Sequence, residues 1–235
     1  MTTWKVAAGA LIYLAVACGG RAAQPARATP SVAPSEEGLH WHGRIAQGGE
    51  VDVHVVRGSV RAEVTSGEEA QIDAAGGACR LHVPPDDGRV RVSAGAGDAE
   101  LVVKVPAGVR LVVHAVDGPV RASGIRDVDA HVVNGGIEIV HAARVRARSV
   151  NGPITLALDA PDASTLSTVN GDIDVSLPAS ADVDVDARSA TGQIALAVPV
   201  TGSVDAKSVH GAIGRGGHSL RLRSVSGKIS VGTPK

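Results

Sequence analysis

The amino-acid sequence predicts an all-β protein with a single parallel β-solenoid domain, and three observations lead to this prediction. A stretch such as "SVNGPITLAL" (149–158) recurs along the chain, its copies alternate apolar with polar residues, and the chain contains no Phe. Alternation with a period of two is typical of a β-strand, so each copy predicts a strand, a turn and a second strand with one face buried. The central glycines of the copies, 16 to 21 residues apart, are Gly118, Gly135, Gly152, Gly171, Gly192, Gly211 and Gly227.

These marker glycines also define the apolar columns of the predicted interior. Looser copies around Gly58, Gly77 and Gly97 extend the array over residues 39–235, which makes roughly ten short stacked coils. We expect the residues two after each marker, and those two and five before it, to fill a thin interior of Val, Ile, Leu and Ala. The residues two before the markers are Val116, Val133, Val150, Val169, Ala190, Val209 and Val225.

The Asn-Gly pairs of the copies also allow an antiparallel meander with tight hairpins. Two residues weigh against it, because Pro119 and Pro153 follow their markers where a two-residue hairpin needs a paired backbone N–H. A parallel solenoid stacks equivalent residues of successive coils instead. It therefore predicts Asn134, Asn151 and Asn170 in one column, with their amides hydrogen-bonded along the stack.

The N-terminal segment has the composition of a signal peptide, which we assign to residues 1–17. Its apolar run, 6–17, is too short to span a bilayer comfortably. The letters "AVAC" ending at Cys18 resemble the lipobox of bacterial lipoproteins, which implies cleavage before Cys18 and acylation of this residue; a plain secretory signal is the alternative. Residues 18–38 are rich in Ala and Pro and predict a flexible linker.

Composition excludes several classes of function. The formal net charge of −1 gives no attraction for nucleic acid. Trp41 is the only aromatic residue beyond the first segment, too few for a carbohydrate-stacking platform, and we expect it to cap the first coil. If Cys18 is acylated, Cys79 has no disulfide partner, and its position predicts a small inward-facing side chain. No comparable cap follows Val231, which predicts a short final coil or a partner there.

Two columns carry candidate metal ligands, and each column can also be interpreted as an ordinary solvent-exposed strand face. His54, His114 and His131 stand four residues before their markers and predict a column of imidazoles about 5 Å apart, able to chelate a transition metal. A solvated strand face is the alternative. The column continues as a basic stripe that favours anionic glycans or lipid head groups. Its further members are Arg148, Ser167, Arg188, Lys207 and Arg223.

The second candidate column is acidic. Asp182, Asp184 and Asp186 share one face of a predicted strand, and Asp172 and Asp174 lie on the preceding coil. Same-face residues on a strand are about 6.5 Å apart, too far for all three carboxylates to hold one Ca²⁺. The alternative is a set of polar outer positions that oppose aggregation. The sequence therefore predicts no catalytic residue, no cofactor and no assigned metal site.

The copies also carry a family resemblance. The stretch "LVVKVPAGVRLVVHAVDGPVRASG", followed by "HVVNGGIEIV", "SVNGPITLAL" and "TVNGDIDVSL", resembles the bacterial toastrack, or putative adhesin, family. The resemblance implies a right-handed single-chain β-solenoid on the cell envelope. It implies no catalytic residues, since none are defined for the family.

We expect a non-catalytic protein that is secreted across the inner membrane and lipid-anchored in the cell envelope, in the outer membrane if the host is diderm. Its expected role is adhesin-like binding or structural support. Candidate partners, besides the membrane itself, are envelope polysaccharide, an anionic surface or another envelope protein. A β-helical carbohydrate-active enzyme and a scaffold or sensor of an envelope stress system are the alternatives. The sequence sets neither the ligand nor the oligomeric state.

Overall fold

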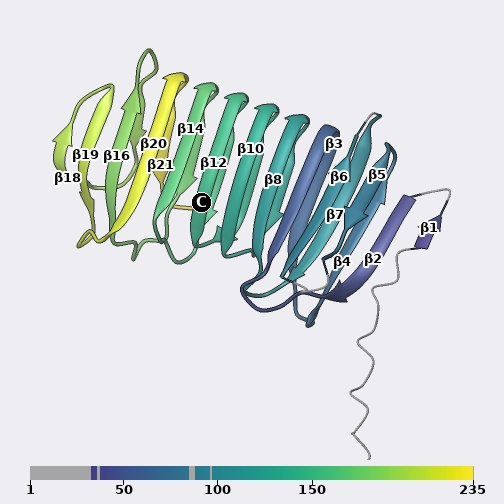
Figure 1. Cartoon of the computed structure of the whole chain (residues 1–235). Coiled ribbons are helices and arrows are strands. Elements are labelled where there is room, and N and C mark those ends of the chain that lie inside the picture. The colour runs from purple at the N-terminus through teal and green to yellow at the C-terminus, as the bar shows by residue number, and fades with distance from the viewer. Residues whose placement is uncertain (1–32, 36–37, 85–87, 96, 235) are drawn as a thin grey trace, which may run out of the picture.

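The computed structural model describes residues 33–35, 38–84, 88–95 and 97–234. The predicted signal peptide (1–17), Cys18 and most of the predicted linker lie outside these residues. Within them the regular structure is entirely β, which confirms the predicted all-β class. No helix long and apolar enough to cross a membrane occurs in this part of the chain. The strands stand side by side in one long array (Figure 1).

The strands in chain order are β1 (Ala33–Ser35), β2 (Gly38–Arg44), β3 (Glu50–Thr65), β4 (Glu69–Ala75), β5 (Cys79–His82), β6 (Arg89–Ala94), β7 (Ala99–Pro106), β8 (Arg110–Asp117), β9 (Val120–Ser123), β10 (Asp127–Asn134), β11 (Ile137–Ala142), β12 (Arg144–Asn151), β13 (Ile154–Leu158), β14 (Ser164–Asn170), β15 (Ile173–Ser176), β16 (Val183–Ser189), β17 (Ile194–Leu196), β18 (Thr201–Val204), β19 (Ser208–Ile213), β20 (His218–Ser226) and β21 (Ile229–Gly232).

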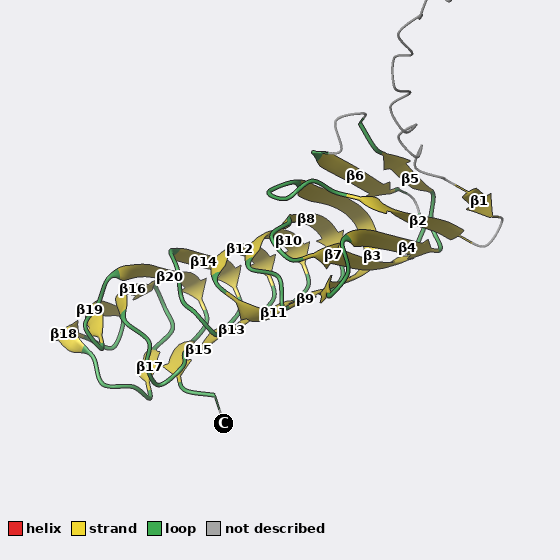
Figure 2. Cartoon of the chain, turned by 90° about the horizontal axis from the view of Figure 1, so that it is seen from below, coloured by secondary structure: helices red, strands yellow, loops and turns green. Residues whose placement is uncertain are grey.

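The array has two layers, which Figure 2 shows from below. The front layer has the order β5-β6-β3-β8-β10-β12-β14-β20-β16-β19-β18. The back layer has the order β1-β2-β4-β7-β3-β9-β11-β13-β15-β21-β17. The long strand β3 belongs to both layers, because its first half pairs with β8 and its second half with β9.

The central copies stack in parallel and in register, as the solenoid prediction requires. Asn134 lies opposite Asn151 in the front layer, and Ile137 lies opposite Ile154 in the back layer. Each copy therefore gives one strand to each layer and turns the corner at its marker glycine. The hairpin alternative is wrong for these copies, because their strands pair with the neighbouring copies rather than with each other.

The marker glycines are required by close packing at this corner. Gly135 has a φ of 151°, and a Cβ built on it would lie 2.1 Å from the carbonyl oxygen of Gly118. The same approach repeats along the column, where a Cβ on Gly152 would lie 2.1 Å from the carbonyl oxygen of Gly135. Successive coils thus touch backbone to backbone at the corner, which leaves no room for any side chain.

The core fills the space between the layers, and it corrects one predicted column. Ile137, Ile154 and Ile173, two residues after their markers, are at most 1% exposed, as predicted. Six of the valines two residues before the markers lie on the outer face instead, and Val133 and Val150 are each 42% exposed. Val209, on the antiparallel strand β19, is the exception at 1% exposed. Positions five and two before a marker are an odd number of residues apart, so they point to opposite faces of one strand. Only the first of these two columns can be buried.

The coils do not follow chain order, and fewer than the predicted ten are parallel. The last unit, β20–β21, is inserted between β14–β15 and β16–β17. The copy around Gly211 forms β19, which runs antiparallel to β16. Strand β6 and strand β7 stand on the outer side of β3. Eight units therefore contribute parallel strands to both layers among the residues that the structure describes.

Antiparallel strands close the array at the N-terminal end, and Trp41 confirms the predicted cap. Strand β2 pairs antiparallel with β4, and the Trp41 side chain of β2 is 1% exposed. The prediction of a short final coil or a partner after Val231 is wrong, because the copy that ends there is not the last one in the array. Val231 lies in β21, which β17 covers, and is 1% exposed. The distal end of the array is formed by β17 and β18 instead.

Candidate functional site

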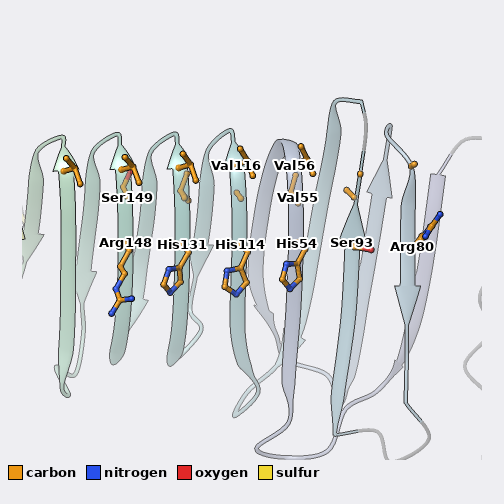
Figure 3. A pocket seen from close by; sticks show the side chains of 18 of the residues that line it. His54, Val55, Val56, Arg80, Ser93, His114, Val116, His131, Arg148 and Ser149 are labelled. Carbon is orange, nitrogen blue, oxygen red and sulfur yellow. The ribbon is translucent and has the colours of Figure 1, made fainter.

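The candidate site is a groove of about 860 Å³ on the outer face of the front layer. Strands β3, β8, β10, β12 and β14 form its floor, and the turn before β5 and the end of β6 form one wall. Figure 3 shows three imidazoles side by side in a row that Arg148 continues. None of the described residues that line this groove is Asp or Glu.

The three histidines form a stacked ladder, as their spacing predicts. His114 lies in register with His54 on one side and with His131 on the other. The ring centroids of His54 and His114 are 4.7 Å apart at an interplanar angle of 16°, and those of His114 and His131 are 5.2 Å apart at 22°. The parallel pairing of three strands thus fixes the spacing of the imidazoles.

Two buried carboxylates flank the ladder, and sequence reasoning missed both. Asp52 Oδ1 lies 2.8 Å from His54 Nε2, and Asp129 Oδ1 lies 3.1 Å from His131 Nε2. The side chains of Asp52 and Asp129 are only 8% and 12% exposed. The signal was present in the sequence, since "DVH" (52–54) and "DAH" (129–131) place an Asp and a His on the same face of a strand.

Arginines from neighbouring strands neutralise these carboxylates. Arg91 Nε donates a hydrogen bond to Asp52 Oδ2 at 3.0 Å. Asp129 Oδ2 accepts a hydrogen bond from Arg110 at 3.1 Å and lies 3.6 Å from an Nη1 of Arg146. A buried carboxylate is tolerated only when such partners offset its desolvation. Asp129 therefore has two guanidinium neighbours, whereas Asp52 has one.

The surroundings of the central imidazole lower its pKa, which favours the neutral form. Burial lowers the pKa of His114 below the usual value of 6.5, and the neighbouring His54 and His131 lower it further. Asp52 and Asp129 act in the opposite direction. A neutral imidazole keeps a free lone pair, which makes His114 suited to accept a hydrogen bond or to bind a metal ion.

Beside the ladder runs an apolar surface that we call the valine ridge. Its members, which precede their marker glycines by two residues, are 42% to 52% exposed. They are Val56, Val116, Val133, Val150, Val169 and Val225. An exposed apolar patch that is continuous over several strands marks an interaction surface more often than scattered single residues do.

The predicted asparagine column borders the ridge at the corner and is confirmed. Asn151 Nδ2 donates to Asn134 Oδ1 at 2.9 Å, and Asn170 Nδ2 donates to Asn151 Oδ1 at 2.9 Å. This asparagine column begins at Asp117, which accepts a hydrogen bond from Asn134 at 2.7 Å. These side chains bond to one another, so they contribute to the stack rather than to a ligand site.

The predicted basic stripe is confirmed in part. Arg148, Ser167 and Arg223 follow His131 across the front layer, and Arg188 comes after Arg223 because β20 is inserted before β16. Lys207 does not belong to the stripe, since it lies in the turn between β18 and β19. Arg148 and Arg223 are exposed and form no ion pair with the described residues.

The acidic column has a structural task. Asp182 accepts hydrogen bonds from the backbone N–H of Arg215 at 2.7 Å and from its guanidinium at 2.8 Å, and these bonds lower the pKa of Asp182. Asp184 accepts from the backbone N–H of Gly217 at 3.1 Å. Both carboxylates hold the loop that crosses from β19 to β20. Asp186 instead accepts from Arg188 at 3.2 Å, so the three do not converge on one point.

The structure describes one of the two cysteines, Cys79. Cys79 is a free thiol, half-buried against the core, and donates to the carbonyl oxygen of Gly76 at an Sγ to O distance of 3.3 Å. Burial raises the pKa of Cys79, which keeps it in the unreactive thiol form. The predicted lipidation site, Cys18, lies outside the described residues.

Comparison with known proteins relates the chain to one family. Among the solved structures that are similar to it are two that each share 11% sequence identity with it. A putative cell adhesion protein from Clostridium sporogenes matches with a TM-score of 0.45 over 84% of this chain and all of its own. A putative adhesin from Bacteroides fragilis matches with a TM-score of 0.38 over 84% of this chain and 98% of its own.

No curated protein matches the chain. The family model described as Toastrack DUF4097 matches residues 45–232, which include every parallel coil described above. The protein is therefore a member of the Toastrack family.

Proposed function

We propose that this protein is a non-catalytic, adhesin-like binding module of the bacterial cell envelope, and that its front face binds another envelope protein. The observation that carries this proposal is the valine ridge, which runs unbroken over six strands beside the exposed Arg148 and Arg223. At about 25 cal/mol per Å², covering about 60 Å² of each valine would contribute roughly 1.5 kcal/mol per residue.

The chemistry of the face favours a protein partner with apolar and acidic side chains. Apolar side chains of a partner would cover the valines, and carboxylates would pair with Arg148 and Arg223. A polysaccharide ligand usually stacks on exposed aromatic rings, whereas Trp41, the only aromatic residue among those described, is buried. The experiment must therefore distinguish binding of a protein from binding of an anionic polysaccharide.

The groove also favours binding over catalysis. Glycoside cleavage needs a pair of carboxyl groups facing the substrate, and no carboxylate is among the described residues that line the groove. The titratable groups there are His54, His114 and His131 together with Arg80 and Arg148. This set supports recognition of an anionic partner rather than hydrolysis.

We propose further that acylated Cys18 anchors the protein in the envelope, with residues 18–38 as the tether. Several acyl chains, at about 0.8 kcal/mol per buried CH₂, would hold it stably at a membrane. The support for this part is the lipobox-like sequence alone.

The test measures binding of the detergent-solubilised full chain to an envelope extract, before and after the extract is treated with a broad-specificity protease. We expect saturable binding that protease treatment abolishes and that Arg148→Glu combined with Val150→Asp weakens at least tenfold. Arg61→Glu, on the exposed outer face of the back layer, is the matched control and should bind normally.

Three results would each overturn part of this proposal. Binding that survives protease treatment and follows the purified polysaccharide would identify a glycan ligand. Release of soluble oligosaccharide from that polysaccharide would identify an enzyme. If both front-face and back-face variants bind like the wild type, the front face is not the binding surface.

A further inference from the structure

We propose that Asp52, His54 and His114 form a binding site for one divalent transition-metal ion on the outer face of strands β3 and β8. One oxygen of Asp52 and one ring nitrogen from each histidine lie within 4.8 Å of one another. Two imidazole nitrogens and one carboxylate oxygen are a donor set that suits Zn²⁺, Ni²⁺ or Cu²⁺ better than Ca²⁺ or Mg²⁺. This site is independent of the proposed partner.

The buried oxygen of Asp52 provides a second, independent observation. Asp52 Oδ1 is buried and has no hydrogen-bond partner among the described residues, although His54 Nε2 lies 2.8 Å away. The contact is close, but it lacks hydrogen-bond geometry. An unpartnered carboxylate oxygen inside a protein is costly, and a metal ion held between Asp52 and the two imidazoles would satisfy it.

The geometry needs only a small adjustment to close around an ion. Metal–nitrogen bonds of about 2.1 Å place tetrahedral ligand atoms about 3.4 Å apart. Donor atoms that lie up to 4.8 Å apart must therefore approach by about 1.4 Å at most. Asp52 Oδ1 and His54 Nε2, which lie 2.8 Å apart, must separate by about 0.6 Å. The side chain of His54 is 45% exposed, which leaves space on its solvent side for the ring to move. Asp52 is held by its 3.0 Å hydrogen bond from Arg91 on the neighbouring strand β6, so the imidazoles rather than the carboxylate would shift.

The opposite side of the ladder is less suited to a cation, although Asp129 Oδ1 is also buried without a hydrogen-bond partner. Asp129 has the two guanidinium groups of Arg110 and Arg146 within 3.6 Å, and the next residue in the ladder after His131 is Arg148. These positive charges repel a metal ion. The three ring centroids also span too great a length for one ion to bind all of them, so one site on the Asp52 side is expected.

The site would join two segments that the chain does not connect directly. Strand β3 carries Asp52 and His54, strand β8 carries His114, and β4 to β7 lie between them in the sequence. An ion that binds only the folded arrangement stabilises it by mass action. Metal binding therefore predicts a rise in the unfolding temperature in addition to a binding isotherm.

The test titrates the untagged, EDTA-treated full chain in detergent with Zn²⁺ by calorimetry and repeats the thermal unfolding with and without the ion. We expect one ion per chain, a raised unfolding temperature, and at least tenfold weaker binding for His114→Ala. His131→Ala should stay within threefold of the wild type. The control is His42→Ala, which removes an exposed histidine of β2 remote from the ladder. With Ni²⁺, the ring-proton NMR signals of His54 and His114 should broaden first.

Asp52→Asn serves as the second ligand variant and should weaken binding without abolishing folding, because the amide oxygen can still accept from Arg91. Each variant is first checked for the wild-type circular dichroism spectrum in EDTA. Unchanged binding by a folded His114→Ala would refute the site. An equal loss in His131→Ala would also refute it, because that result would mean diffuse binding along the ladder.

Discussion

The corner column of glycines leads to a sharp prediction about why the repeat keeps its Asn-Gly signature. Replacing Gly135 by Ala should destabilise the protein for two reasons. The backbone has a φ of 151°, which residues other than glycine rarely adopt, and the new Cβ would lie 2.1 Å from the carbonyl oxygen of Gly118. A strained dihedral costs about 1 to 3 kcal/mol, and overpacking adds about 1 to 3 kcal/mol. The expected total loss is therefore about 2 to 6 kcal/mol.

A matched variant separates the two terms. Gly48 also has a positive φ, 77°, but a Cβ there would meet nothing within 4 Å. Gly48→Ala should cost only the strain of a left-handed residue, about 1 to 2 kcal/mol. Urea unfolding followed by circular dichroism measures both losses. If Gly135→Ala and Gly48→Ala lose the same stability, close approach of the coils is not what requires glycine at the corner.

Four further predictions concern the stack, its charges and the anchor. Asn151→Ala removes the middle of the amide ladder and should lower the free energy of unfolding by about 1 kcal/mol, whereas an unchanged urea midpoint would show that the exposed ladder contributes nothing. Ile154→Asp buries an unpaired charge at a position 0% exposed, so a folded array with wild-type melting would contradict the register. The pKa of His114 is lower in the folded protein than in the unfolded chain, so the unfolded chain binds a proton at this residue more readily. The contribution of His114 to the free energy of unfolding should therefore be complete above pH 6.5 and should decrease as the pH falls below that value. The decrease should be smaller in His114→Gln. Cys18→Ser should move the protein from the membrane pellet to the soluble fraction, and continued pelleting would exclude acylation.

The sequence was sufficient for the fold class because the repeat carries its own register. Stacking equivalent residues placed Asn134, Asn151 and Asn170 in one bonded column and brought His54 beside His114 across 59 intervening residues. Such pairing follows from period-two alternation and a constant marker. Neither observation depends on how the chain connects one coil to the next.

The chain order of the coils was beyond sequence reasoning. A unit such as β20–β21 carries the same apolar columns whether it stacks after β16–β17 or before it, so its letters do not distinguish the two arrangements. The deciding contacts are long-range ones, in which Asp182 and Asp184 hold the loop that crosses β16. Those carboxylates looked like possible ligands only because their partners, Arg215 and Gly217, are distant in the sequence.

The sequence predicted the histidines of the candidate site but not the carboxylates beside them. The histidine column follows from spacing, but Asp52 and Asp129 do not. The coil between them has Val112 at the equivalent position, so stacking between coils predicts no acidic column there. The valine ridge falls among the predicted core positions because its residues are apolar, although its odd offset from the buried column places it on the outer face. Exposed valines at the same place in six repeats are themselves a sign of a binding surface.

The measurement that tests the central claim most directly is photo-crosslinking from two positions on opposite faces. A photoreactive amino acid is placed at Ser167, which lines the groove on β14, or at Thr155, which is exposed on the back-layer strand β13. The account predicts that an envelope protein crosslinks from position 167 and not from position 155, and that Arg148→Glu with Val150→Asp removes the product. Crosslinking from both positions alike, or from position 155 alone, would contradict the front face as the binding surface.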